Sequence, residues 1–100
     1  MRIAIGSDHR GWQVKARLVK MLQGAGYEIF DLGTNSADSV DYPDIASAVS
    51  SRVSAGDVER GILICGTGIG MSISANKFSG VRAATCQDAF VAEMLSLIHI

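Results

Sequence analysis

The sequence predicts an α/β fold in which helices cover both faces of a parallel sheet. Short apolar runs alternate along the chain with longer segments of helical periodicity. Glycines and polar residues separate these segments over short connections. Elements that alternate in this way form parallel sheets with right-handed crossovers. The 100 residues are enough for one domain of this kind.

The predicted strands are short runs dominated by apolar residues. The run at 61–65 is almost wholly apolar, as expected when both faces of a strand are covered. The four predicted strands comprise residues 2–6, 27–32, 61–65 and 81–86.

The predicted helices are recognised by apolar residues spaced three and four apart. Proline suits a first helical turn, so Pro43 is expected to open the second helix. Glycines are expected to stop the first three helices, at Gly24 and Gly26, at Gly56 and at Gly80. The apolar face of the first helix, 12–23, is expected to comprise Val14, Leu18, Met21 and Leu22. The second predicted helix begins at Pro43, the third occupies 70–78 and the fourth occupies 88–95. The result is a Rossmann-like three-layer αβα sandwich of four βα units.

Composition excludes several classes of function. The formal net charge is −1 and no basic run occurs, so no nucleic-acid surface is expected. The N-terminal residues begin a strand pattern rather than a secretory signal, and no apolar run is long enough to span a bilayer. Two cysteines are too few for a disulfide scaffold, which predicts free thiols in the cytoplasm.

The most informative segment joins the third strand to the helix after it. Cys65 ends the strand and a glycine-rich loop, Gly66-Thr67-Gly68-Ile69-Gly70, follows. The backbone N–H groups of such a loop can converge on an anion and would lower the pKa of the thiol. The alternative interpretation is a small buried residue beside a tight turn. A cysteine-phosphatase loop is excluded because Met71 stands where arginine is needed, and a P-loop because no Gly-Lys-Ser/Thr follows.

Polar residues also follow the first strand. Asp8 and His9 lie where ligands bind in parallel sheets, outside the carboxyl ends of the strands. The alternative is that Asp8 caps the next helix while His9 is solvated. Tyr42, before Pro43, either lines the same site or packs on the rim of the core. Structural or surface roles are favoured for the other candidates, Trp12, Lys77, Arg82 and Cys86.

These motifs together resemble the type B ribose-5-phosphate isomerase family, which includes galactose-6-phosphate and allose-6-phosphate isomerases. The resemblance covers 1–94 and is most specific in the segment GILICGTGIGMSISANKF at 61–78. It is supported by IGSDHRG at 5–11, DLGT at 31–34, DYPDIA at 41–46 and GVRAA at 80–84.

The resemblance implies aldose–ketose isomerisation through an enediolate, with ribose 5-phosphate favoured as substrate. Cys65 would be the general base and Thr67 would hydrogen-bond the reacting oxygens. The substrate would also contact Asp8, His9, Tyr42, Gly66, Gly68, Ile69 and Gly70. No metal or organic cofactor is implied. Relatives form dimers with active sites at the subunit interface, so a homodimer or a dimer of dimers is expected.

The sequence departs from the family pattern at its C-terminal end. Family members continue with a His-Asn-Asp segment, a fifth strand and phosphate-binding arginines. Counted from Cys65, the family histidine falls at Ile98, so His99 is assigned no role. Residues 95–100 match the translation of a transposase adapter used in sequencing libraries and are expected to be a non-native tail. The domain at 1–94 is therefore expected to be incomplete and the chain itself to be nearly inactive. Two alternatives stay open: a non-catalytic, flavodoxin-like module that binds a phosphorylated ligand, and an inert fragment that folds poorly because its last strand and helix are missing.

Overall fold

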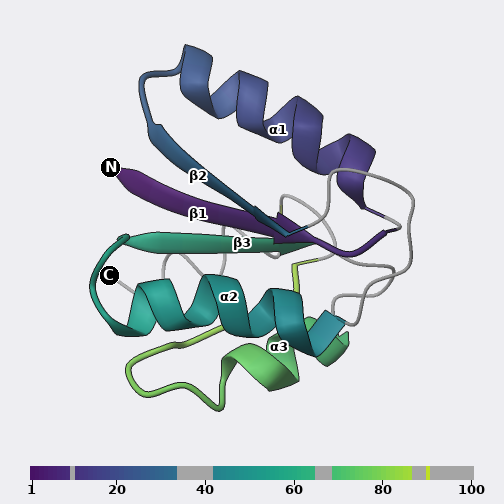
Figure 1. Cartoon of the computed structure of the whole chain (residues 1–100), viewed down its shortest axis with the longest axis vertical. Helices are drawn as coiled ribbons and strands as arrows, with labels where there is room; N and C mark the ends of the chain where they lie inside the picture. Colours follow the sequence, from purple (N-terminus) through teal and green to yellow (C-terminus); the bar gives the residue numbers. More distant parts are fainter. Residues whose placement is uncertain (10, 34–41, 65–68, 87–89, 91–100) are drawn as a thin grey trace.

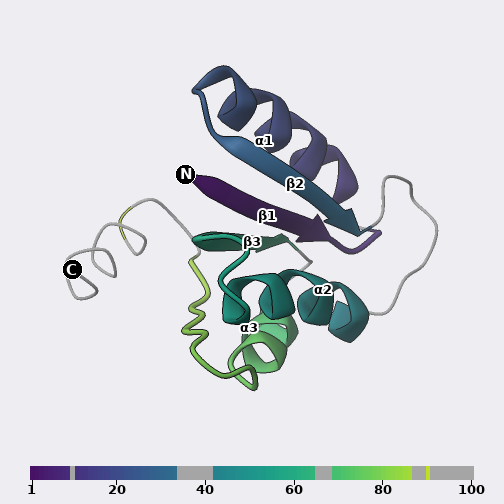
Figure 2. The same cartoon turned by 60° about the vertical axis from the view of Figure 1, so that its left-hand side comes forward.

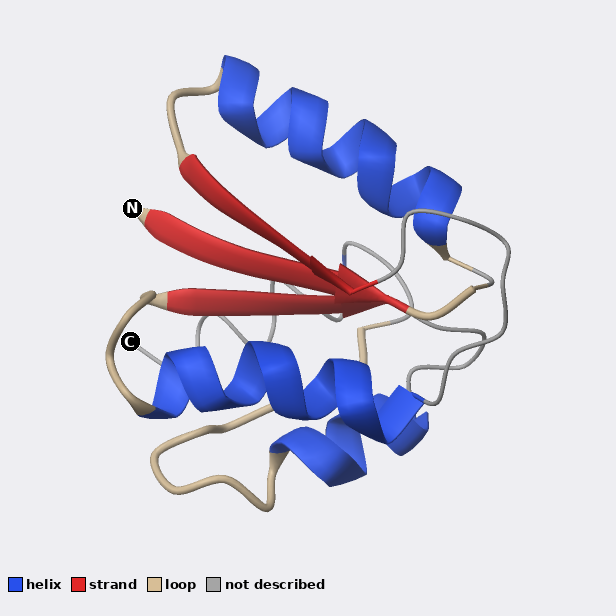
Figure 3. Cartoon of the chain, viewed as in Figure 1, coloured by secondary structure: helices blue, strands red, loops and turns tan. Residues whose placement is uncertain are grey.

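A computed structural model describes residues 1–9, 11–33, 42–64, 69–86 and 90. Its sheet consists of three parallel strands in the order β2-β1-β3 (Figure 1). Helix α1 covers one face of the sheet, and helices α2 and α3 lie on the other side (Figure 3). This arrangement confirms the predicted Rossmann-like αβα architecture. The elements are β1 (Arg2–Ser7), α1 (Trp12–Gly24), β2 (Glu28–Gly33), α2 (Tyr42–Ser54), β3 (Arg60–Ile64) and α3 (Ile69–Ala75).

The central strand β1 is the most deeply buried. Its residues Ile3, Ala4 and Ile5 are all buried, because strands lie on both sides of it and helices on both faces. From β1 the chain passes through α1 to β2 on one side and then through α2 to β3 on the other. The strand order therefore reverses at β1, and ligands of open α/β sheets bind at the carboxyl ends beside such a reversal.

Helix α2 approaches the sheet closely because glycines face it. A Cβ atom at Gly6 would stand 2.9 Å from a methyl carbon of Val49, and one at Gly61 would stand 2.8 Å from another. Val49 also packs with Ala4 and Val58 in the main hydrophobic cluster. The small residues of β1 and β3 thus determine how deeply α2 sits.

The predicted stops at Gly26 and Gly56 are confirmed, because α1 ends at Gly24 and α2 at Ser54, whereas Gly24 is the last residue of α1 rather than a stop and Gly80 lies beyond the end of α3. Gly26, Gly56 and Gly80 have φ angles of +96°, +79° and +75°. Such angles are strained for residues with a Cβ atom, which is why glycine serves there. The third helix is shorter than predicted and ends at Ala75, five residues before Gly80.

The prediction of a fourth strand at 81–86 is wrong for this structure. Figure 2 draws these residues as a loop outside the three-stranded sheet. The side chain of Asn76 forms hydrogen bonds with the N–H and the carbonyl of Ala83, which in a strand would pair with a neighbouring strand. Its Nδ2 donates to the carbonyl of Ala83 at 2.9 Å, and its Oδ1 accepts from the Ala83 N–H at 2.8 Å. The predicted helix at 88–95 lies outside the described residues except for Phe90, as does the predicted domain boundary at residue 94.

The buried face of α1 also differs from the prediction. Val14 is 43% exposed and Met21 is 61% exposed, whereas Lys15 is fully buried. Leu18 and Leu22 are half-buried, as the periodicity indicated. The helix is therefore rotated from the predicted orientation so that a lysine, rather than Val14, faces the sheet.

Candidate active site

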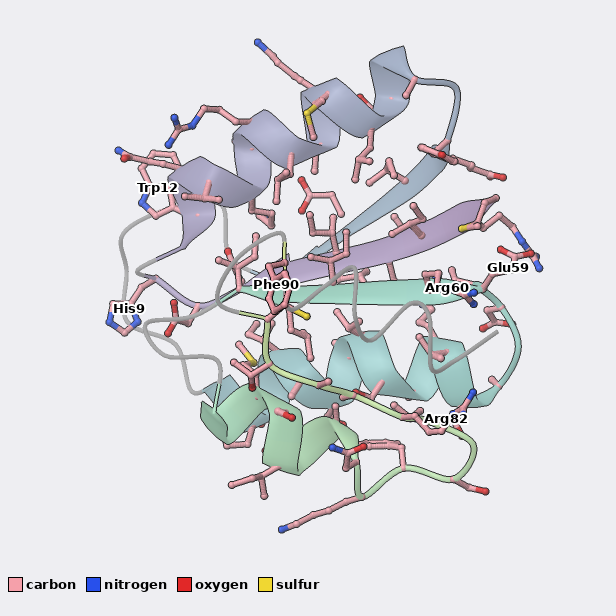
Figure 4. All side chains as sticks on the ribbon, turned by 180° about the vertical axis from the view of Figure 1, so that it is seen from behind. His9, Trp12, Glu59, Arg60, Arg82 and Phe90 are labelled. Atoms are coloured by element: carbon pink, nitrogen blue, oxygen red, sulfur yellow. The ribbon has the colours of Figure 1, made fainter. Side chains whose placement is uncertain are left out.

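The carboxyl ends of the three strands meet at one edge of the sheet. Ser7 ends β1, Gly33 ends β2 and Ile64 ends β3, and Ser7 lies in register with both of the others. His9 and Trp12 lie at this end of the molecule, while Glu59 and Arg60 lie at the opposite end (Figure 4). Asp8 and His9, which follow β1, thus lie at the edge where β3 also ends.

A backbone hydrogen bond joins the loop after β1 to the end of β3. The amide of Asp8 donates to the carbonyl oxygen of Ile64 at 3.1 Å. Asp8 is 8% exposed and His9 is half-buried. Asp8 is therefore bonded to the residue that precedes the predicted catalytic cysteine, Cys65, in the sequence.

The same two segments are in close contact at Gly11. A Cβ atom there would stand only 2.6 Å from Cγ2 of Ile64. At the neighbouring strand end, Gly33 has a φ of +96°, and a Cβ on it would lie 3.2 Å from the carbonyl oxygen of Ser7. Glycine is therefore favoured at position 11 by the closeness of Ile64, and at position 33 by the positive φ and by close contacts with both Ile45 and Ser7.

The interpretation of Asp8 as a helix cap is not supported. The N-cap of α1 is Gly11, and no side chain forms a capping hydrogen bond there. Asp8 instead contributes its carbonyl oxygen, which accepts from the Gly11 N–H at 3.2 Å. Its backbone therefore forms a tight turn that leads the chain from β1 into α1.

Several predicted site residues fall outside the described part of the chain, namely Cys65, Gly66, Thr67 and Gly68. Tyr42 is the first residue of α2 and Ile69 the first of α3. Gly70 is the second residue of α3 and is half-buried. The predicted roles of these residues remain predictions.

The structure adds an ion pair that the sequence reading missed. The ammonium group of Lys15 on α1 contacts the carboxylate of Asp31 on β2. The side chain of Lys15 is 1% exposed and that of Asp31 is 38% exposed. The one signal in the sequence was Asp31, which interrupts the mainly apolar run of β2, whereas the helical periodicity pointed to Val14 rather than to Lys15.

Ser7 carries a second polar group that was not predicted. The residue is fully buried, and its Oγ finds no hydrogen-bond partner among the residues that the structure describes. An unsatisfied buried hydroxyl costs roughly 1–3 kcal/mol, so such groups are uncommon in folded proteins. Ser7 ends the central strand β1, so this buried hydroxyl lies next to the candidate site.

Two further tests bear on the class of protein. Within the described residues, no three side chains of the metal-binding types gather closely enough to hold an ion. The helices of the described segments are too short or too polar to cross a bilayer.

Comparison with known proteins decides the family. The sequence pattern of the family described as Ribose/Galactose Isomerase matches residues 3–99. The chain belongs to this family. The ribose-5-phosphate isomerase B of Escherichia coli (strain K12) is 47% identical over 93 residues, which are 93% of this chain and 62% of that protein. The 4-deoxy-4-sulfo-D-erythrose isomerase of Clostridium sp. (strain MSTE9) is 41% identical over 100 residues, 99% of this chain and 63% of that protein.

A solved structure gives the same result at the level of the fold. The ribose-5-phosphate isomerase B of Clostridium thermocellum superposes with a TM-score of 0.91 and is 49% identical. The match covers 94% of this chain and 64% of that one. The chain thus spans slightly less than two thirds of the length of these family members.

Proposed function

We propose that the protein isomerises a phosphorylated aldose to the corresponding ketose, with ribose 5-phosphate and ribulose 5-phosphate as the favoured pair. Membership of the Ribose/Galactose Isomerase family supports the reaction class. The observation that carries the proposal is the hydrogen bond from the Asp8 amide to the Ile64 carbonyl, at 3.1 Å. It holds two proposed substrate-binding residues, Asp8 and His9, beside the strand end that leads into Cys65.

The proposed reaction moves a proton between adjacent sugar carbons. The thiolate of Cys65 takes the proton from carbon 2 of the open-chain aldose. The electrons of that bond form the double bond between carbons 1 and 2, and the carbonyl oxygen becomes an oxyanion. A proton passes from the oxygen on carbon 2 to the oxygen on carbon 1, and the Cys65 thiol returns its proton to carbon 1. The result is the ketose, with no net gain or loss of protons or electrons.

The remaining predicted residues serve this proton transfer. Backbone N–H groups in the segment from Gly66 to Gly70 would stabilise the enediolate, and donors of this kind are typically worth roughly 3 kcal/mol each. Thr67 would orient the reacting oxygens. Asp8 and His9 would bind the sugar phosphate, with His9 nearer the phosphate, and Tyr42 would line the pocket.

The nature of the sugar is a separate question. Ribose 5-phosphate is favoured because several similar proteins are named for it. A second candidate is a sugar with a sulfonate in place of phosphate, since a relative matching 99% of this chain is named as a sulfo-erythrose isomerase. The 6-phosphates of allose and galactose are further alternatives within the family.

The test is exchange of the carbon 2 proton of ribose 5-phosphate with solvent deuterium, followed by NMR. The exchange assay is carried out on the whole gene product. Cys65→Ala should reduce exchange about 10²–10⁴-fold, the usual contribution of a general base. Cys86→Ala is the matched control, because Cys86 is the other cysteine, is exposed, and should leave exchange unchanged. Retained exchange in Cys65→Ala contradicts the role of the thiol.

Parallel assays separate the alternatives. Faster turnover of a sulfo-sugar or of a hexose 6-phosphate would reassign the substrate. Binding of ribose 5-phosphate without proton exchange in the wild-type protein would support the non-catalytic module. The predicted homodimer is checked by sedimentation of the same preparation.

A further inference from the structure

The inference concerns the buried ion pair between Lys15 on α1 and Asp31 on β2. Its burial is asymmetric, because the lysine side chain is 1% exposed and the aspartate side chain 38%. The charged end of a fully buried lysine therefore meets a carboxylate that still reaches water. This ion pair joins α1 to β2 by a directional contact in addition to apolar packing.

Stability is a weak explanation for such a pair. Removing two charges from water costs free energy that their attraction seldom exceeds, and well-packed apolar residues often replace such pairs without loss. The better attested role of buried ion pairs is to specify which of several packings is adopted. In α1 two orientations of the helix about its axis can be distinguished, one that buries Val14 and one that buries Lys15. The structure has the second, with Val14 43% exposed and Lys15 buried.

The orientation of α1 matters because its first turn is continuous with the candidate site. The Lys15 amide donates to the Gly11 carbonyl at 2.9 Å, and the Gly11 amide donates to the Asp8 carbonyl at 3.2 Å. The Asp8 amide donates in turn to Ile64 at 3.1 Å. The turn that carries Asp8 and His9 is thus fixed at one end to β3.

We propose that the Lys15–Asp31 ion pair fixes the other end of this turn, and so positions Asp8 and His9 over the end of β3. Lys15 and Asp31 are positioning residues and do not contact the substrate. Any effect of this positioning on catalysis rests on the proposed isomerase function. The positioning itself is a statement about the folded chain and is tested without turnover.

The experiment is hydrogen exchange of backbone amides, followed by NMR on the full 100-residue chain. In Lys15→Met a flexible apolar side chain of similar length replaces the lysine, and the partly exposed Asp31 can be hydrated. The amides of Asp8 and Gly11 should exchange about tenfold faster or more relative to that of Ile5, since local openings are governed by local contacts. Unchanged relative rates at Asp8 and Gly11 would overturn the proposal.

The matched control is Arg2→Met, which breaks another ion pair on the sheet. Arg2 pairs with Glu59 at 3.1 Å, both side chains are nearly half exposed, and Glu59 lies at the opposite end of the molecule from His9 (Figure 4). This variant should leave the relative exchange of the Asp8 and Gly11 amides unchanged. An equal acceleration in both variants would mean that general destabilisation explains the effect, and the proposal would fail.

A double variant separates the ion pair from simple burial. Lys15→Met combined with Asp31→Leu should recover thermal stability, because apolar packing replaces the charges, while the Asp8 and Gly11 amides stay fast. Recovery of their slow exchange would show that packing alone holds the turn and would overturn the proposal.

If Lys15→Met does not fold, the wild-type chain decides the question. The amides of Asp8, Gly11 and Lys15 should then open in one event, with the same dependence on urea. Separate opening of the Lys15 amide would refute the positioning role. Neither outcome depends on sugar turnover, so failure of the isomerase proposal is distinguishable from failure of this one.

Discussion

Replacing Gly11 by alanine tests whether the β1–α1 turn is pressed against β3. The added Cβ would stand 2.6 Å from Cγ2 of Ile64 and 3.3 Å from its carbonyl oxygen. The backbone at Gly11, with φ of −108° and ψ of 4°, is accessible to alanine, so any penalty comes from the contact rather than from the dihedral angles. The methyl carbon falls short of ordinary contact distance by about 0.8 Å, so the turn, β3 or the Ile64 side chain must shift.

The expected magnitude follows from two opposing effects. Overpacking of a dense site typically costs about 1–3 kcal/mol. Substituting alanine for glycine recovers about 0.4–1 kcal/mol by restricting the unfolded chain. The net loss expected for Gly11→Ala therefore centres on about 1.3 kcal/mol, which corresponds to roughly 5–10 °C in Tm for a domain of this size.

The assay is urea unfolding followed by fluorescence of Trp12, the single tryptophan, and by circular dichroism. Gly24→Ala, at the other end of α1, is the control, because a Cβ there meets nothing within 4 Å. It should be neutral or stabilising by up to about 1 kcal/mol. Adding Ile64→Ala to Gly11→Ala should relieve part of the loss, since it removes the clashing methyl group. Gly11→Ala at or above wild-type stability would refute the reasoning.

Two further predictions concern other parts of the fold. Hydrogen bonds from the side chain and backbone N–H of Arg2 lower the pKa of Glu59 from 4.5 to about 2. The pair should therefore stabilise the fold above the unfolded pKa and lose this effect as the pH falls toward 2. Urea midpoints of wild type and Glu59→Gln should differ slightly at about pH 6 and converge near pH 2, and a gap independent of pH would contradict this. Asn76→Ala should lower stability by about 1–3 kcal/mol in urea unfolding, because the Ala83 N–H loses its acceptor and the Ala83 carbonyl keeps only the 3.5 Å hydrogen bond from Ser72 Oγ. Equal stability of Asn76→Ala and wild type would show that water replaces these bonds fully.

Much of the architecture could be predicted from the sequence because it depends on local chemistry. Apolar runs such as 61–65 favour strands whatever surrounds them. Glycine at 26, 56 and 80 permits the positive φ angles that end or follow helices. Alternation of the elements then requires parallel strands, whose carboxyl ends meet at one edge. That edge, with Asp8 and His9 beside the end of β3, was predictable for the same reason.

Other features required the tertiary structure, because they depend on which groups meet across the chain. The spacing of apolar residues favoured Val14 over Lys15 as a buried residue. Such spacing carries no information about a carboxylate on another element of the fold. Only the folded chain brings Asp31 to that lysine. The run at 81–86 has strand composition, yet a strand also needs a neighbour, and the Asn76 side chain occupies the backbone groups of Ala83 instead.

The sequence by itself thus determined the fold class, the edge of the sheet that holds the candidate site, and the residue types gathered there. The tertiary structure decided how the edge is held together, through the Asp8–Ile64 hydrogen bond, the close approach at Gly11 and the Lys15–Asp31 pair. The physical reason is the range of the interactions. Propensity and periodicity act between neighbours in the chain, whereas hydrogen bonds, ion pairs and steric fit at a site act between residues that only folding brings together.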